Sequence, residues 1–386
     1  MAEKRRPDWT APVLFGRRRV AEPERGRASK ASVLNVYLSR YALLLALVLL
    51  TVFFSAIRPR TFGTVDNLEA IATAETPVII LAFAEMVVLI VGRIDLSIGA
   101  TFSLSSVLAA NLVIVHHLNP AVGIAAALAA AAVIGAVNGA LVAFARIDAF
   151  VVTLATWTIV NGLVLLYTNG TSIFGHTSGF FGSLTVGKAA GIPRLLIYAL
   201  VATAIIGVLL ASFPMGRRMY ATGSNERAAM LTGIRTRRYT VATFAVGAVL
   251  AGLAGVLLTS NTGSAAPGVG DSLLIPAITA AFLGGTCVTP GRFNPTGTLI
   301  AAYLIAIAVA GLQQLGAAQW VTPVFNGLML LVAVSVSLIA SRASARRARA
   351  ARLRTLRERS DAERASERSD PPSAHFEDPQ LSLQSE

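Results

Sequence analysis

Ten long apolar blocks, separated by short polar segments, recur along this chain of 386 residues. Most are about 20 residues long, the length with which an α-helix crosses roughly 30 Å of hydrocarbon. Only 14% of the residues are charged, against about 25% in soluble domains. We therefore predict an all-α fold, a polytopic transmembrane helical bundle of about ten spans. The blocks lie at 36–57, 67–92, 97–116, 120–144, 150–168, 193–213, 239–260, 272–290, 295–315 and 320–341.

The distribution of Lys and Arg predicts which side of the membrane each loop faces. With the N-terminus inside, 29 of the 33 basic residues fall on the inner side. When both tails are set aside, the inner loops still hold nine and the outer segments four. We expect both termini in the cytoplasm and a multi-pass location in the plasma (inner) membrane. The net charge of +13 then reflects orientation, and we expect no nucleic-acid partner.

Composition divides the chain into three parts. Residues 1–35, rich in Arg, Glu, Pro and Ala, are predicted to form a disordered, basic cytoplasmic tail. Residues 36–341 contain all the spans and form the transmembrane domain. Residues 342–386 form an Arg-rich cytoplasmic tail, prone to helix until Pro371-Pro372. We interpret it as a solvated segment held near anionic membrane lipid, with a site for a specific partner as the alternative.

The sequence holds no pattern that is typical of catalysis. It has no phosphate-binding Gly-x-x-x-x-Gly-Lys-Ser/Thr loop, so the chain does not itself bind ATP in that manner. Its four histidines are not at ligand spacing with any cysteine or acidic residue, and it has no nucleophile elbow. Cys287 is the single cysteine, which excludes an intrachain disulfide. We expect no enzymatic activity, no metal site and no cofactor bound by this chain.

A polar segment at 214–238, which carries six arginines, stands between two apolar blocks. Ser224 or Asn225 can cap a short helix, and Glu226 in its first turn suits the positive helix end. Gly233 can take the left-handed conformation that ends a helix. The pattern predicts a short cytoplasmic helix held between two spans, on which a partner in the cytosol can push. The alternative interpretation is an ordinary basic inner loop.

Residues 215–234 read MGRRMYATGSNERAAMLTGI and resemble the cytoplasmic coupling loop of ribose/xylose/galactose-type permeases of ATP-binding-cassette (ABC) importers. The family pattern is Gly-Arg-x-x-x-Ala-x-Gly-x-Asn-x-x-Ala-Ala-x-x-x-Gly-Ile. Two adjacent alanines within it offer a small surface for close docking. The predicted ATPase-coupling residues are Gly216, Arg217, Gly223, Asn225, Glu226, Ala228, Ala229, Gly233 and Ile234, and Ala221 also matches the pattern.

Three further segments resemble the same family, and the likeness runs from about residue 40 to 341. VGRIDLSIGA at 91–100 resembles its Gly-Gly-Ile-Asp-Leu-Ser-Val-Gly segment, and 150–170 resembles its Phe-Ile-x-Thr-Leu-Gly-Thr run. The glycine-rich stretch at 281–302 resembles its last motif. The sequence departs from the family at three positions, namely Arg93, Asn161 and Pro290.

The resemblance implies a permease subunit without enzymatic activity of its own. Its implied partners are a second permease copy (identical or related), a cytoplasmic ABC ATPase that uses ATP, and an extracytoplasmic solute-binding protein that delivers a small carbohydrate. The alternatives are an ion- or proton-coupled secondary transporter, or an ABC permease for a non-sugar solute such as branched-chain amino acids.

Polar residues within or beside the spans are candidates for a translocation path or a helix break, because an unpaired polar group at membrane depth is costly. Asp95 is interpreted first as a helix-cap aspartate, with Arg93 or a backbone amide near Ser97 as its partner, and alternatively as a substrate contact. Trp157 and Asn161 are interpreted as packing residues, or else as a pair that stacks on and bonds to a sugar. The candidates are Glu85, Asp95, Ser97, Thr153, Trp157 and Asn161.

Two other residue types are given structural roles. Glu85 and the asparagines of the spans are predicted to make interhelical hydrogen bonds. Glycines within the spans are predicted to allow close helix packing. The asparagines are Asn111, Asn138 and Asn161, and the glycines are Gly135, Gly139, Gly247, Gly252 and Gly255.

Overall fold

The computed structural model describes residues 30–176 and 179–369. The chain divides into two units, residues 1–38 and 39–386, and apart from the first residues of helix α1 the features below belong to the second unit.

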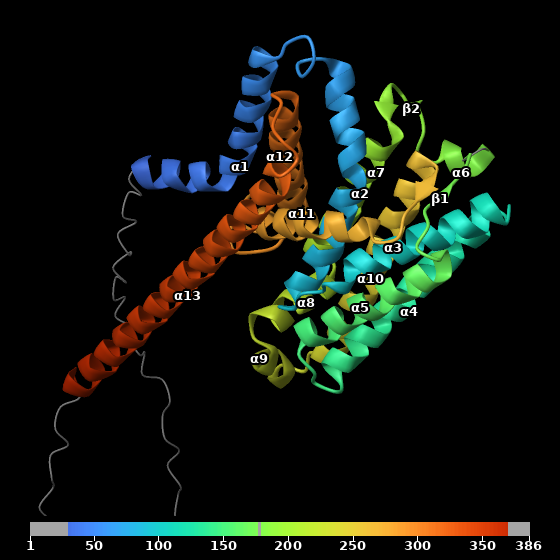
Figure 1. Ribbon diagram of the computed structural model, residues 1–386. Coiled ribbons are helices and arrows are strands. Elements are labelled where there is room, and N and C mark those ends of the chain that lie inside the picture. Colours follow the sequence, from blue (N-terminus) through green and yellow to red (C-terminus); the bar gives the residue numbers. More distant parts are fainter. Residues whose placement is uncertain (1–29, 177–178, 370–386) are drawn as a thin grey trace, which may run out of the picture. The chain divides into compact units, whose positions relative to one another are not determined.

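Helices make up almost all of the described chain (Figure 1). The first begins at Lys30, ahead of the boundary predicted at residue 35, and residues 1–29 of the predicted tail lie outside the described part. The helices are α1 (Lys30–Ile57), α2 (Val65–Ile90), α3 (Ser97–Ala110), the π-helix η1 (Asn111–Val115), α4 (Pro120–Ala143), α5 (Ala149–Thr168), α6 (Gly179–Ser183), α7 (Arg194–Ser212), α8 (Pro214–Ser224), α9 (Glu226–Leu231), α10 (Thr236–Thr262), α11 (Val269–Gly284), α12 (Pro295–Gln314) and α13 (Val321–Ser369).

Seven helices of the described residues are long and apolar enough to cross a membrane, namely α2, α3 with η1, α4, α5, α7, α10 and α12. Three shorter apolar helical stretches lie at Tyr41–Ile57, Val269–Gly284 and Val321–Val336. Each of these ten stretches falls on one of the predicted blocks. An all-α, polytopic membrane protein is therefore confirmed, while the number of ten spans and the cytoplasmic termini remain predictions.

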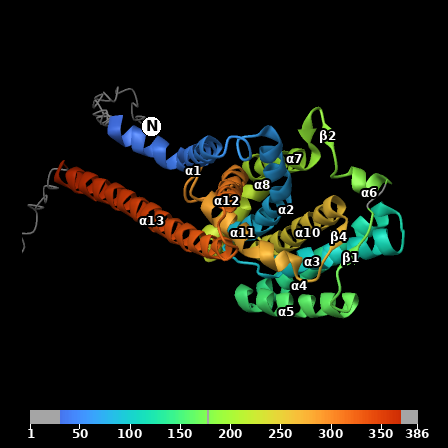
Figure 2. The same ribbon diagram turned by 45° about the horizontal axis from the view of Figure 1, so that its top comes forward.

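Helix α2 forms the centre of the core. Its residues 76–90 are all buried, and it contacts α7, α10, α11 and α12. The views in Figures 1 and 2 show α10 and α11 running close to it. Thr64 caps its start by accepting a hydrogen bond from the amide of Asn67 at 3.3 Å. A helix that is apolar on every side is typical of the interior of a large bundle.

The helix α10 packs against α4 and α3 through the predicted glycines. A Cβ added at Gly135 would overlap the carbonyl oxygen of Phe244, and one at Gly255 would overlap that of Phe102. A Cβ at Gly252 would lie 2.8 Å from the Cβ of Ala131. The predicted role of these glycines in close helix packing is confirmed.

Within the described residues, four two-residue strands lie in the connections between helices. β1 (Ile173–Phe174) pairs antiparallel with β4 (Ser264–Ala265), and β2 (Lys188–Ala189) with β3 (Ile192–Pro193). The β2–β3 hairpin is joined to α2 by an ion pair of 2.6 Å between Lys188 Nζ and Glu69 Oε2.

The last helix, α13, runs from Val321 to Ser369 without a break. Residues 342–369 of the predicted tail therefore continue the helix of the last apolar block. The remaining tail residues, with the predicted stop at Pro371-Pro372, lie outside the described part of the chain.

The glycine packing predicts that a Gly→Ala change has opposite effects on the free energy of unfolding at two helix positions. Gly135→Ala should lower the free energy of unfolding by about 1–3 kcal/mol, because the new methyl group overpacks the α4–α10 contact. Gly327→Ala in α13 is the matched control, since no atom lies within 4 Å of its added Cβ. Alanine is the better helix former, so this control should be neutral or stabilising by up to about 1 kcal/mol.

The measurement is the midpoint of thermal unfolding of the purified chain in detergent. Equal shifts for the two variants would contradict the packing assignment.

Candidate functional site

The polar segment between α7 and α10 forms two short helices instead of the single one predicted. Pro214 opens α8 at its first turn, where its fixed φ and missing N–H are tolerated. Asn225 then takes an extended conformation (φ −160°, ψ 99°), which ends α8 and starts α9. The polar residue in the middle of the segment therefore divides it.

Asn225 is the N-cap of α9, since its Oδ1 accepts a hydrogen bond from the amide of Ala228 at 3.0 Å. Ser224 instead donates back to the carbonyl of Tyr220 within α8 at 2.8 Å. Glu226 lies in the first turn, and Gly233 has a φ of +82° just after the helix ends. The predicted capping residue, acidic first turn and terminating glycine are confirmed.

The outward face of α9 differs from the predicted docking surface. Ala229 is buried against its own chain, so of the two alanines only Ala228 is exposed. Two apolar side chains at the end of the helix face outward, with exposed fractions of 47% for Met230 and 90% for Leu231. An apolar tip surrounded by a polar, basic segment is a surface suited to a protein partner.

Close backbone contacts attach α8 to the core. A Cβ at Gly216 would overlap the carbonyl oxygen of Leu210 in α7, and one at Gly223 that of Ile90 in α2. Neither position tolerates a side chain without a shift of backbone. These two glycines of the predicted coupling loop therefore allow α8 to lie directly against two spans.

A second attachment joins α8 to the loop between α11 and α12. The hydroxyl of Tyr220 donates to the carbonyl of Phe293 at 2.5 Å, and the guanidinium of Arg292 lies 4.1 Å from the centre of the Tyr220 ring. Burial raises the pKa of the Tyr220 hydroxyl, and the positive charge of Arg292 opposes that rise. The glycine-rich motif at 281–302 and the coupling segment thus meet in space.

The third attachment is an ion pair between α9 and the loop that follows α2. Arg93 Nη2 lies 3.0 Å from Glu226 Oε2, and both side chains are partly exposed. Of the two partners predicted for Asp95, Arg93 is therefore not the one, because its guanidinium pairs with Glu226 of the neighbouring helix. A partly exposed pair stabilises the fold by only about 0–1 kcal/mol, so its effect is mainly to position α9.

Asp95 lies one residue before the N-cap of α3, Leu96, and its side chain bonds to the first residue of that helix, as predicted for an aspartate near the cap. Its Oδ1 accepts hydrogen bonds from the amide of Ser97 at 2.9 Å and from the hydroxyl of Ser97 at 2.6 Å. Its own N–H donates to the buried carboxyl of Glu85 at 3.2 Å, so Glu85 bonds to this loop rather than to another helix. Burial raises the pKa of Asp95 to about 6, and the bonds from Ser97 oppose that rise.

The buried polar chain continues from Asp95 into α4 and α5. Asn138 Nδ2 donates to Ser97 Oγ at 2.9 Å, and Thr156 Oγ1 donates to Asn138 Oδ1 at 2.6 Å. The interhelical role predicted for Asn138 is confirmed. Thr153, also fully buried, bonds to the carbonyl of Ala149 in its own helix.

Trp157 and Asn161 converge on a carboxylate that the sequence did not single out. Trp157 Nε1 donates to Asp271 Oδ1 at 2.7 Å, and Asn161 Nδ2 lies 3.2 and 3.0 Å from the two carboxylate oxygens. All three residues are half-buried, with Asp271 in the first turn of α11. An aromatic ring, an amide and a carboxylate together have the chemistry that recognises a hydroxylated solute.

Asp271 was missed because it falls one residue before the apolar block predicted at 272–290. A signal was present, since it is the only acidic residue between 239 and 292. The six candidate path residues therefore separate into two groups. Glu85, Asp95, Ser97 and Thr153 are enclosed in the interior and bonded there, whereas Trp157 and Asn161 gather around Asp271.

Comparison with known proteins gives the family. The profile of the family described as the permease component of branched-chain amino acid transport systems matches residues 67–334. The chain belongs to this permease family. It is therefore a transport component rather than an enzyme, and with its apolar helices it is a multi-pass protein of the plasma membrane.

The ribose import permease protein RbsC of Bacillus subtilis is 38% identical over 256 residues, which cover 66% of this chain and 79% of that protein. The protein of the same name in Escherichia coli K12 is 32% identical over 296 residues, 76% and 92% of the two chains. The D-allose transport system permease protein AlsC of Escherichia coli K12 is 27% identical over 307 residues, 80% and 94%. The resemblance to sugar permeases of ABC importers is confirmed. No solved structure matches the chain.

The capping geometry predicts how α9 responds to a single truncation. Asn225→Ala should destabilise the helix by about 1 kcal/mol, because the amide of Ala228 loses its acceptor. Hydrogen–deuterium exchange of residues 226–231 in the purified chain should then speed up about fivefold. Ser224→Ala is the control and should leave exchange in α9 unchanged; equal effects of the two changes would contradict the assignment of the cap.

Proposed function

We propose that the chain is the translocating permease subunit of an ABC importer for a small carbohydrate. Its relatives support the cargo, since their names specify ribose import, D-allose transport and L-arabinose transport. The observation that carries the proposal is the α9 tip, an exposed apolar helix end that directly follows α8, which close backbone contacts hold against two spans.

The partner that docks on this tip is proposed to be a cytoplasmic ABC ATPase. Leu231 and Met230 enter a pocket of the ATPase, and Ala228 allows close approach along the helix. ATP is bound and hydrolysed by that partner. Movement of α9 passes to the α2–α3 loop through the Arg93–Glu226 pair, and movement of α8 passes to α2 through the Gly223 contact.

The remaining partners follow from the same family pattern. A second permease copy, identical or related, completes the path between two subunits. A solute-binding protein on the extracytoplasmic side delivers the sugar, and the basic residues after the last span lie near anionic lipid on the cytoplasmic side.

The translocation path is proposed to pass the cluster of Trp157, Asn161 and Asp271. The indole ring can cover the apolar face of a sugar ring, while Asp271 accepts hydrogen bonds from its hydroxyl groups. In the described conformation Trp157 and Asn161 occupy the acceptor sites of Asp271. The hydroxyl groups of an arriving sugar would replace these two side chains as hydrogen-bond donors to Asp271.

Two alternatives remain as outcomes of a transport assay. A proton-coupled transporter would use Glu85 and Asp95, but both are committed to the start of α3 by hydrogen bonds. The family description names branched-chain amino acids. Uptake of labelled leucine but not of pentose would favour a permease for branched-chain amino acids. Uptake without any ATPase, abolished by a protonophore, would favour a proton-coupled transporter.

The coupling assignment is tested by placing charge on the exposed face of α9. Ala228→Glu combined with Leu231→Glu should weaken ATPase association about thirtyfold, because a buried hot-spot residue contributes about 2 kcal/mol or more. ATP-dependent sugar uptake into proteoliposomes that hold the full importer should fall accordingly. Neither residue supports the fold, so the amount of chain in the membrane should not change.

Leu353→Glu, in the exposed part of α13, is the control for added charge on an apolar side chain. It should leave both association and uptake unchanged. Normal uptake by the α9 double variant would overturn the assignment.

The path assignment is tested at Asp271. Asp271→Asn keeps the size of the side chain and removes its charge, which should lower sugar uptake about tenfold because charge-assisted hydrogen bonds are the stronger ones. ATPase association and the amount of chain in the membrane should stay at wild-type values. Ser272→Ala, next to it and exposed, is the control; an unchanged uptake rate in Asp271→Asn would remove this cluster from the path.

A further inference from the structure

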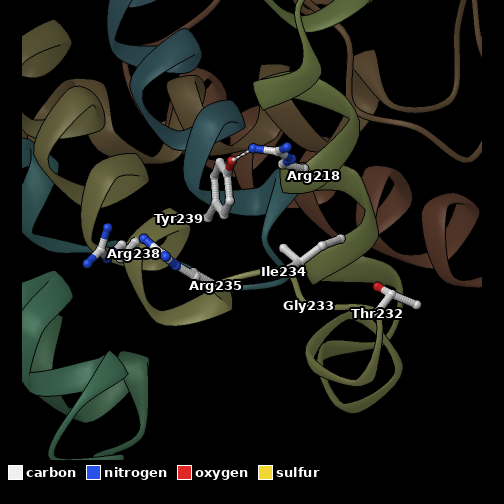
Figure 3. A pocket seen from close by; sticks show the side chains of 7 residues that line it. All are labelled: Arg218, Thr232, Gly233, Ile234, Arg235, Arg238 and Tyr239. Atoms are coloured by element: carbon white, nitrogen blue, oxygen red, sulfur yellow. Dashed lines mark hydrogen bonds between the residues drawn. The ribbon is translucent and has the colours of Figure 1, made fainter.

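A basic pocket lies beside the coupling segment, between α8 and the first turn of α10. Its volume is about 460 Å³, and its charged lining consists of Arg218, Arg235 and Arg238 with Tyr239 beside them. Figure 3 shows Arg218 reaching from α8 to the hydroxyl of Tyr239, to which it donates at 3.1 Å. Residues 232–234, after α9, complete the wall.

The charges in this pocket are unbalanced within the described chain. None of its lining residues is acidic, and among the described residues neither Arg235 nor Arg238 forms an ion pair. A second pocket on the other side of α9 provides a comparison, with a volume of about 420 Å³. Its lining includes four arginines, but also Asp148 and Glu226, and Glu226 is paired with Arg93. The first pocket therefore offers three guanidinium groups to an external anion, with no carboxylate among its lining residues.

The pocket lies next to the end of one candidate span, α7, and the start of another, α10. Helix α8 begins two residues after α7 ends, and α10, a candidate span, begins at Thr236. Phe213 and Met215 at the start of α8 are exposed apolar side chains. Exposed apolar residues, arginines and a tyrosine at the ends of spans are typical of the interface with lipid headgroups.

We propose that this pocket binds the phosphate headgroup of an anionic phospholipid in the cytoplasmic leaflet. Arg235 and Arg238 lie on one side of the α10 start, three residues apart, and can bond to phosphate oxygens, while Arg218 approaches from α8. The bound lipid would fix α8 against α10, beside the surface on which the ATPase is proposed to dock. The proposal rests on the proposed function only for the orientation of the membrane.

An acidic segment of the ATPase is the competing occupant. The apolar α9 tip already provides a candidate protein-docking surface, whereas the pocket lies at the start of α10, a candidate span. Its position therefore favours a lipid phosphate over a carboxylate of the partner.

The test uses the purified full-length chain in neutral detergent, without ATPase or sugar. Binding of short-chain phosphatidylglycerol is measured by titration and by native mass spectrometry, with phosphatidylcholine and inorganic phosphate as comparison probes. Arg235→Gln with Arg238→Gln should weaken phosphatidylglycerol binding at least about tenfold. Arg235→Lys with Arg238→Lys should restore part of it, since lysine keeps the charge but not the bidentate geometry.

Arg146→Gln with Arg227→Gln, in the second pocket, is the matched control. This double variant also removes two positive charges near α9, and it should leave phosphatidylglycerol binding within about twofold of wild type. The exposed positions of all four arginines should keep the thermal midpoints equal.

Three results would overturn the proposal. Equal loss in the two pairs of variants would show general attraction between charges. Inorganic phosphate that binds as tightly as the lipid and displaces it would show a site for soluble anions. Unchanged lipid binding together with weaker retention of the ATPase would assign the pocket to the partner protein. Lipid binding is measured on the chain alone. The lipid proposal can therefore be contradicted while ATP-dependent sugar uptake is confirmed, and lipid binding can be confirmed while sugar uptake is contradicted.

Discussion

Where a helix ends inside a membrane protein, its backbone N–H and C=O groups must find hydrogen-bond partners within the protein. In this chain the break between α2 and α3 is such a place. Asp95 accepts from the first amide of α3, and Glu85 accepts from the amide of Asp95. Asn138 then bonds to Ser97 and ties α4 to the same point. The arrangement of the central helices depends on these buried bonds, because each would be costly to leave unmade.

The coupling segment is built onto the same break. Gly223 brings α8 against the last turn of α2, and Arg93, two residues before Asp95, pairs with α9. Thr156, at the far end of the buried chain, directly precedes Trp157. The surface proposed for the ATPase and the cluster proposed for the sugar are thus connected by packed and hydrogen-bonded groups, which is the physical requirement for one to act on the other.

Predictions from the sequence are confirmed where the feature depends only on neighbouring residues. The length of an apolar block determines whether its helix can cross the hydrocarbon, and seven of the ten blocks hold such a helix among the described residues. The cap at Asn225 and the glycine at 233 follow from backbone conformations that few other residues take so readily. The prediction that both alanines of α9 face outward is wrong, because Ala229 is buried. The buried Ala229 and the exposed Leu231 could not be told apart, because burial depends on which face of a short helix meets the core.

The sequence by itself determined that this is an all-α membrane protein of the permease family, with a capped helix in a basic loop, because block length, charge asymmetry and motif order do not depend on packing. Tertiary structure alone decided the partners of the polar side chains. Glu226 meets Arg93 and Asp271 meets Trp157 across more than a hundred residues of sequence. Pairings at that separation are set by how the helices pack, and no local pattern encodes them.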